Sequence, residues 1–187
     1  MIGIIGAMDV EVEHLKNELT DRETVTVSGI EFARGFLFGK EAVIAKCGIG
    51  KVFAAICAEA MILHFNVDCI INTGVAGTLT NKLTVGDTAI SSAVVQHDMD
   101  TSALGDPVGM VSGIDKIYFD ADPELVLKAE KAIKLAGINY VCGVIASGDR
   151  FIGDSESKKR IVENFNAVAC EMEGGAIGHA AYINDVP

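Results

Sequence analysis

The stretch AVACEMEGGAIGHAA, from Ala167 to Ala181, places two carboxylates between an apolar run and a pair of glycines. The run 167–170 predicts a short buried strand, and the small residues after Gly175 are compatible with a helix. In a strand, Glu171 and Glu173 would project to the same side, because side chains alternate between the two faces. Two carboxylates at the end of a buried strand are costly to desolvate unless a ligand or partner binds them. The stretch therefore predicts either a ligand-binding pair or two solvated acids at a helix start.

The composition of the 187-residue chain fits a single domain with a substantial core. Half of the residues are hydrophobic, but no uncharged apolar run reaches the roughly 18 residues of a membrane span. The first residues soon turn acidic and lack a basic region, which does not fit a signal peptide. A formal net charge of -11 argues against nucleic acid as a partner, since its backbone requires a basic surface.

The cysteines are five in number and widely spaced, and they form no CxxC pair: Cys47, Cys57, Cys69, Cys142 and Cys170. Each lies among apolar neighbours in the sequence. We therefore expect reduced cysteines in the core of a cytoplasmic protein.

The first quarter of the chain predicts strands around one helix. Residues 1–6 (MIGIIG) predict a buried strand, and a helix follows with Asp9 as its N-cap or first-turn acid. Between Thr24 and Cys47, apolar and alternating runs separated by turns at Ser28-Gly29 and Gly39-Lys40 predict an antiparallel meander. The sheet is therefore expected to be mixed.

Two glycine-rich turns follow strands at residues 48–51 and 74–77. The first precedes a helix over 52–65, but Lys51 is not followed by the Ser or Thr of a phosphate-binding Walker loop, so a turn over a neutral ligand edge is expected. The second follows the run 67–73, which predicts a well-buried strand. This second turn opens no helix, so it does not fit a dinucleotide fingerprint, although its N–H groups could bind an anion or hydroxyl.

The segment His97–Asp100 (HDMD) follows residues 86–96, which predict a strand pair or one long strand, and contains potential metal ligands. They are crowded into one short segment and lack a His or Cys partner pattern, so a hydrogen-bonded loop is expected rather than a metal site. Residues 101–116 then predict a surface loop or lid.

The remaining elements predict an α/β fold. They are an N-capped amphipathic helix within 120–137, a strand over 139–146 and a polar helix over 155–164 with Ser155 as its cap. Strands and helices that alternate with glycine turns predict one α/β domain, residues 1–187, with a mixed sheet.

Six motifs occur in one order from residue 3 to residue 177: GIIGAMDVEVE, KCGIGKV, INTGVAG, HDMD, SGDRFI and CEMEGGAI. Together they resemble the 5'-methylthioadenosine/S-adenosylhomocysteine nucleosidases of the purine nucleoside phosphorylase superfamily. The resemblance implies a three-layer α/β/α fold with a mixed central sheet, and no cofactor or metal. It implies hydrolysis of the N-glycosidic bond of 5'-thioadenosines to adenine and a 5-thio-ribose. It also implies a homodimer whose neighbouring subunit helps to close the 5'-thio pocket, with residues 101–111 as the candidate contact.

The resemblance assigns roles around the ribose. Glu11 corresponds to the base that activates the attacking water, and Glu173 corresponds to the carboxylate that holds the ribose 2'-hydroxyl. Met172 and Glu171 would line the ribose, with Ile49 near the sugar.

The resemblance also assigns the adenine and nucleophile sides. Phe151 would stack on adenine, and the backbone of Ile152 would read its edge. Ala7, Val75 and Gly77 would line the nucleophile side. Part of the family has serine in place of Val75, which alters the hydrogen bonding available to the nucleophilic water.

The residues fit this chemistry on physical grounds. Cleavage of a ribosyl bond passes through an oxocarbenium-like state that nearby carboxylates stabilise. A phosphorylase needs Arg or Lys around its phosphate, whereas the loop before Glu11 and the segment INTGVAG contain no Arg, and Glu11 would repel a dianion. Water is therefore the expected nucleophile.

The chain departs from the family at its end. The family continues after NDVP with a strand that carries Arg-x-x-Ser-Asp, whose Asp protonates adenine, and then a helix; this chain ends at Pro187. Because a general acid contributes roughly 10²–10⁴-fold, we expect a C-terminally truncated chain of poor activity. The alternatives are a non-catalytic nucleoside-binding protein, a purine nucleoside phosphorylase and a futalosine-type nucleosidase.

Overall fold

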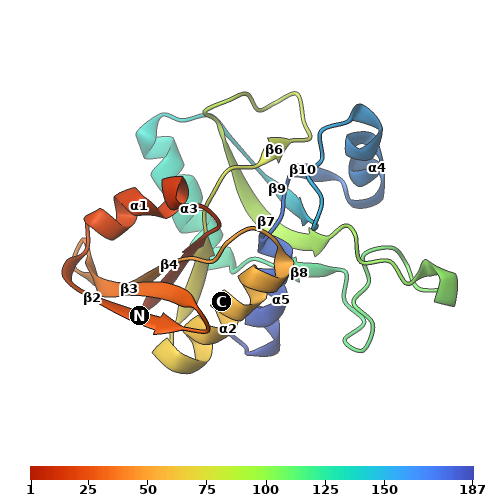
Figure 1. Cartoon of the computed structure of the whole chain (residues 1–187). Coiled ribbons are helices and arrows are strands. Elements are labelled where there is room, and N and C mark those ends of the chain that lie inside the picture. The colour runs from red at the N-terminus through yellow and green to blue at the C-terminus, as the bar shows by residue number, and fades with distance from the viewer. The chain divides into compact units, whose positions relative to one another are not determined.

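The computed structural model describes residues 1–187, which form two compact units (Figure 1). The first unit contains Met1–Val75 and His179–Pro187, and the second contains Ala76–Gly178. Each unit has a five-stranded sheet with parallel and antiparallel pairs, so the α/β class and the mixed pairing are confirmed, with the strands divided between two sheets. None of the helices has the length and apolarity that a membrane crossing requires.

The sheet of the first unit combines a meander with a parallel core. Its strand order is β2 (Thr20–Val27), β3 (Ile30–Leu37), β4 (Lys40–Lys46), β1 (Ile2–Gly6) and β5 (Cys69–Asn72). Strands β2, β3 and β4 pair antiparallel, as predicted, while β1 runs parallel to β4 and β5. Both hairpin turns contain two consecutive residues with positive φ, which matches the right-handed twist of the strands.

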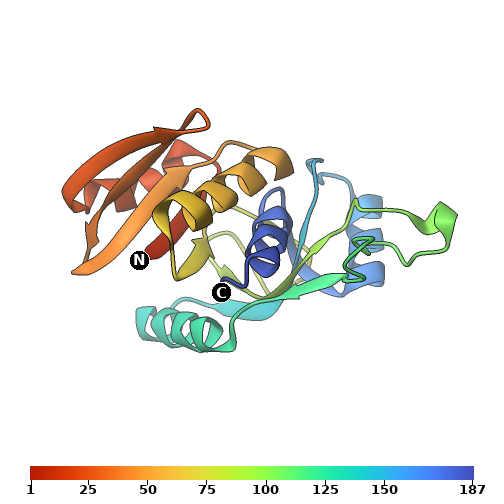
Figure 2. The same ribbon diagram turned by 90° about the horizontal axis from the view of Figure 1, so that it is seen from below.

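Two helices cover opposite faces of this sheet. Helix α1 (Asp9–Asn17) contributes Val12 to a core cluster that includes Ala33 of β3, whereas Phe32 stacks on Phe65 of helix α2 (Lys51–Phe65), with ring centroids 4.9 Å apart. Phe32 and Ala33 are consecutive and therefore face opposite sides of the sheet. Figure 2 shows α2, orange to yellow, running beside the red and orange strands. Met8 is the N-cap of α1, so Asp9 is a first-turn acid.

The predicted burial of the run 67–73 is wrong in part. Strand β5 lies at the edge of its sheet and pairs only with β1. Ile71 is 41% exposed and Asn72 is exposed. Apolar β-branched residues predict a strand, but its position in the sheet depends on long-range pairing.

The sheet of the second unit has a parallel centre. Its strand order is β6 (Gly77–Thr78), β10 (Ala167–Glu171), β9 (Tyr140–Ser147), β7 (Thr88–Gln96) and β8 (Tyr118–Asp120). Strands β10, β9 and β7 are parallel, and the two edge strands are antiparallel. A 3₁₀ turn, Ser102–Leu104, interrupts the predicted loop 101–116.

Three more helices complete the chain: α3 (Pro123–Ala136), α4 (Ser155–Phe165) and α5 (Gly174–Ile183). The predicted cap and stop of α3 are confirmed, since the side chain of Asp122 accepts a hydrogen bond at its start and Gly137 ends it in the left-handed conformation. The predicted cap of α4 is wrong, because Asp154 rather than Ser155 accepts from the backbone N–H of Ser157. A carboxylate one position earlier reaches the free N–H groups of the first turn.

The prediction of core cysteines holds for Cys47, Cys57 and Cys170, which are buried. Cys69 is half-buried, and Cys142 is exposed, contrary to the prediction. The apolar neighbours of Cys142 in β9 face the other side of the strand, so they do not indicate its own burial. None of the five cysteines forms a disulfide.

Candidate functional site

Helix α1 directs the carboxylate of Glu11 at backbone N–H groups of two loops. Oε2 accepts from Ala7 N at 2.7 Å and Met8 N at 2.9 Å, and Oε1 accepts from Val75 N at 2.9 Å. Ala7 and Met8 follow β1, and Val75 follows β5. Because β1 and β5 are parallel neighbours, both loops leave the same edge of the sheet.

These bonds fix the orientation of Glu11 and limit what else it can bind. A carboxylate has about four acceptor positions. Three are used by the backbone, so about one remains for a proton donor such as a water molecule. The loop is packed closely, since a Cβ at Gly74 would lie 2.6 Å from Glu11 Oε1. Position 74 therefore requires glycine for the carboxylate to keep its place.

Ile49 lies in the turn that starts α2. Gly48 and Gly50 have φ values of 98° and 100°, which glycine adopts without strain. Cys47 N donates to Gly6 O at 2.9 Å, which joins the start of this turn to the end of β1. The side chain of Ile49 is 58% exposed and available to a ligand.

In the second unit, the carboxylate of Glu171 is bound by the protein itself. Its Oε1 accepts from the hydroxyl of Ser147, and its Oε2 accepts from Glu173 N at 2.8 Å and Gly174 N at 2.7 Å. The strand ends at Glu171, so the expected alternation does not extend to Glu173. Glu173 is buried, with 9% exposure, in the turn before α5. Cys170 directly precedes Glu171, and burial raises the pKa of its thiol, which favours the neutral, unreactive form.

The HDMD segment supports the loop that carries Phe151, and the predicted hydrogen-bonded loop is confirmed. Asp98 Oδ2 accepts from Asp149 N at 2.8 Å, and His97 N donates to Ser147 O at 2.9 Å. A Cβ at Gly148 would lie 2.5 Å from the His97 ring, so the two segments are in close contact. The structure contains no group of three or more His, Cys, Asp or Glu residues arranged to hold a metal.

The other predicted residues of the second unit differ in exposure. Phe151 is 84% exposed, whereas Ile152 is half-buried against a core cluster that includes Ile161 and Phe165. Gly77 pairs with Cys170 across β6 and β10.

The structure therefore groups the predicted residues into two sets. One set brings Glu11 together with Ala7 and Val75, and the other contains Glu171 and Glu173. The sequence-based assignment omits Ser147, although this residue lies within the quoted SGDRFI motif. Its signal is a polar residue at the end of an apolar parallel strand, where such sheets bind ligands.

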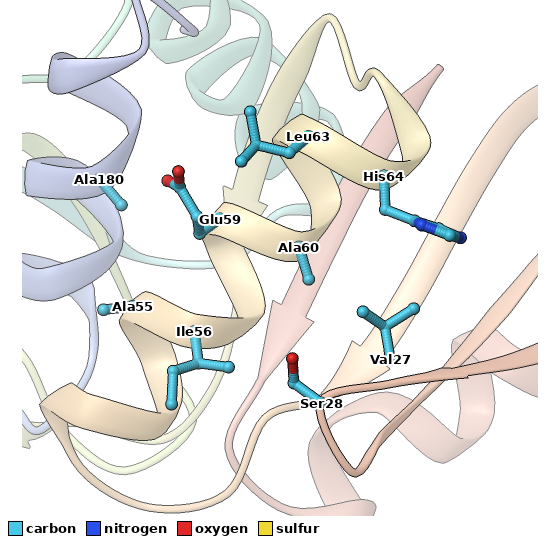
Figure 3. Close-up of a pocket in the computed structure, with 9 residues that line it drawn as sticks. All are labelled: Val27, Ser28, Ala55, Ile56, Glu59, Ala60, Leu63, His64 and Ala180. Carbon is cyan, nitrogen blue, oxygen red and sulfur yellow. The ribbon is translucent and has the colours of Figure 1, made fainter.

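A cavity of about 550 Å³ in the first unit is lined by none of the predicted residues (Figure 3). Six side chains of α2 line it, with Val27 and Ser28 of the first hairpin and Ala180 of α5. Glu59 and Leu63 lie on the side toward Ala180, and His64 lies toward the hairpin. Most of the lining is apolar.

The whole chain, residues 1–187, matches the model of the phosphorylase superfamily. It is 43% identical over 188 aligned positions to the 5'-methylthioadenosine/S-adenosylhomocysteine nucleosidase of Shewanella pealeana, covering 100% of this chain and 81% of the relative. A mutant nucleosidase of the same kind from Helicobacter pylori, solved with 5'-methylthioadenosine in its active site, superposes with a TM-score of 0.95 at 35% identity, covering 100% of this chain and 80% of the other. The futalosine hydrolase of Helicobacter pylori superposes with a TM-score of 0.94 at 34% identity, covering 100% of this chain and 80% of the other.

Proposed function

Because the chain belongs to the phosphorylase superfamily and, within it, to the 5'-methylthioadenosine/S-adenosylhomocysteine nucleosidases, we propose that it hydrolyses the N-glycosidic bond of these two nucleosides. The products are adenine and a 5-thio-ribose. Relatives from Shewanella pealeana and Shewanella sediminis, 43% and 42% identical over this whole chain, are both nucleosidases of this class, which supports these substrates.

The observation that carries the proposal is the carboxylate of Glu11, which two loops orient and which retains about one acceptor position. A base needs such a position to take a proton from water as it attacks the sugar. The loops around this carboxylate, residues 7–8 and 73–77, contain no Lys or Arg. A phosphate dianion would meet the charge of Glu11 without a neighbouring cation from these loops, so water is the favoured nucleophile.

The remaining roles are proposed from family membership. Glu173 holds the ribose 2'-hydroxyl, and its negative charge stabilises the positive charge that develops on the sugar. The residues proposed to line the nucleoside are Ala7, Ile49, Val75, Gly77, Phe151, Ile152 and Met172. The high exposure of Phe151 supports stacking on a base, since its ring face is open to a ligand.

Adenine release tests this function. The chain is incubated with 5'-methylthioadenosine, S-adenosylhomocysteine or futalosine, each with and without phosphate. We expect release from the first two without phosphate, and a fall of roughly 10²–10⁴-fold in Glu11→Gln. Release that depends on phosphate would indicate a phosphorylase. Binding without release would indicate a nucleoside-binding protein. A preference for futalosine would indicate a futalosine-type nucleosidase.

We propose further that the chain forms a homodimer, in which the outer face of α2 contributes to the interface in addition to the expected contact at residues 101–111. Val52, Phe53, Ile56 and Leu63 on this helix are between 40% and 70% exposed, and the apolar cavity lies beside them. An exposed apolar face of this kind favours coverage by another protein surface.

Sedimentation should show a dimer that Leu63→Glu dissociates. Leu127→Glu is the matched control, because Leu127 is 65% exposed against 66% for Leu63 but lies on α3. A monomeric wild-type chain would contradict the proposal.

A further inference from the structure

Ser147 is a fully buried polar residue at the end of β9, with 0% exposure. It is the register partner of Glu171 on the parallel strand β10. Its hydroxyl donates to Glu171 Oε1 and accepts from Gly175 N at 2.5 Å. One buried hydroxyl therefore joins the end of a strand, a carboxylate and the first turn of α5.

Glu171 extends these bonds to Glu173. Its second oxygen accepts from Glu173 N at 2.8 Å and Gly174 N at 2.7 Å, the N–H groups before and after the Cα from which the Glu173 side chain projects. Three acceptor positions of Glu171 are thus used within the protein, and the N-terminus of α5 favours its charge. A carboxylate bound in this way fixes the backbone from which the Glu173 side chain projects.

Close packing supports the same arrangement. A Cβ at Gly175 would lie 2.9 Å from Ser147 Cβ and 3.0 Å from Gln96 Cγ. Only glycine lets the first turn of α5 approach Ser147 closely enough for the bond from Gly175 N. The close approach of α5 to β9 and the hydrogen bond from Gly175 N to the Ser147 hydroxyl therefore depend on each other.

We infer that Ser147 and Glu171 are positioning residues that set the place of the Glu173 carboxylate against the ribose 2'-hydroxyl. Neither residue needs to touch the substrate, because both act through the backbone of Glu173. The inference rests on the proposed nucleosidase function. In it, Glu171 positions Glu173 and does not bind the ribose.

The test compares 5'-methylthioadenosine with its 2'-deoxy analogue. The variants are Ser147→Ala and Glu171→Gln, with Glu173→Ala as the reference for loss of the 2'-hydroxyl contact. For each protein, kcat/KM is measured from adenine release and Kd from calorimetry. Because the effect should run through the 2'-hydroxyl, we expect a loss of roughly 10- to 100-fold on the ribonucleoside and less than about threefold on the 2'-deoxy analogue.

Ser91→Ala is the matched control. Ser91 lies on β7 of the same sheet, and its buried hydroxyl has no hydrogen-bond partner. We expect this variant to keep the wild-type ratio between the two substrates. Melting temperatures of all variants identify any that unfold, and Glu171→Gln, which is nearly isosteric, serves if Ser147→Ala does not fold.

Each outcome decides the matter. A wild-type chain that discriminates between the substrates, with variants that lose activity equally on both, would show a merely structural role and overturn the inference alone. Variants that keep the wild-type ratio and rates would do the same. A wild-type chain that neither binds nor cleaves either nucleoside would overturn the proposed function and this inference with it.

Discussion

At the scale of single residues, Glu11 in the first turn of α1 and Glu171 at the end of β10 are held by different groups. Glu11 is held by backbone N–H groups of two loops and keeps about one acceptor position, which suits a base that acts on water. Glu171 also has three acceptor positions occupied, but by the Ser147 hydroxyl and by two N–H groups of the turn that carries Glu173. On this difference in binding partners rest the proposals of catalysis for Glu11 and of positioning for Glu171.

The substitution Gly74→Ala should disable Glu11 without removing it. The new Cβ would lie 2.6 Å from Glu11 Oε1, so the carboxylate must shift. Since small misplacements of a catalytic group are costly, we expect adenine release to fall by on the order of 10²-fold.

A double-mutant cycle provides the control for this prediction. If Gly74→Ala acts through Glu11, the pair Gly74→Ala and Glu11→Gln should be no slower than Glu11→Gln alone. Fully additive losses would show that Gly74 acts on some other part of the molecule.

At the scale of elements, local signals predicted much of the fold and long-range pairing set the rest. The antiparallel meander, the cap and stop of α3 and the strand-to-helix order all follow from turn residues and periodicity. The edge position of β5 and the bond between Ser147 and Glu171 depend on which strands become neighbours and in what register. Such pairings join residues far apart in the chain, so no local pattern predicts them.

Asp98 should control the loop that carries Phe151. Its carboxylate accepts from Asp149 N, and Asp98→Ala would leave that N–H without this acceptor. We expect KM for 5'-methylthioadenosine to rise by roughly tenfold. Asp100→Ala is the control, because Asp100 accepts from Ser102 N in the neighbouring loop and should change KM by less than about threefold. Equal effects would contradict a specific role for Asp98.

The cap of α4 gives a pH-dependent prediction. Hydrogen bonds from Ser157 lower the pKa of Asp154, so the charged cap stabilises the folded state above the ordinary carboxyl pKa of about 4, and this contribution is lost as the pH falls through the lowered value. Urea denaturation should show Asp154→Ala less stable than wild type at pH 7 and closer to it at pH 3. Ser155→Ala should show little change at either pH, and a larger effect there would restore Ser155 as the cap.

At the scale of the whole molecule, the chain has two units, each with its own mixed sheet, and the predicted residues fall into both. Glu11 belongs to the first unit, while Glu171 and Glu173 belong to the second. The resemblance of ordered motifs predicted the family correctly, because those motifs cover strand ends along the entire chain. The roles of individual residues remain predictions to be tested by substitution.

Thiol labelling tests the distribution of burial over the folded chain. Cys142 is exposed, while Cys47, Cys57 and Cys170 are buried. Partial burial, and secondarily Glu130, raise the pKa of Cys142, so it should react first but more slowly than a free cysteine at pH 8. Cys142→Ser should abolish this first phase, and the buried thiols should react only after denaturation. A fast phase that survives Cys142→Ser would contradict the assignment.

The most direct test of the central claim is the fate of water oxygen. The chain is incubated with 5'-methylthioadenosine in ¹⁸O-labelled water containing phosphate, and the products are analysed by mass spectrometry. Hydrolysis with Glu11 as the base predicts free adenine and a 5-thio-ribose that carries ¹⁸O from the solvent, with neither formed at a comparable rate by Glu11→Gln. A sugar phosphate without solvent oxygen, or the same labelled product from Glu11→Gln at an undiminished rate, would contradict the account.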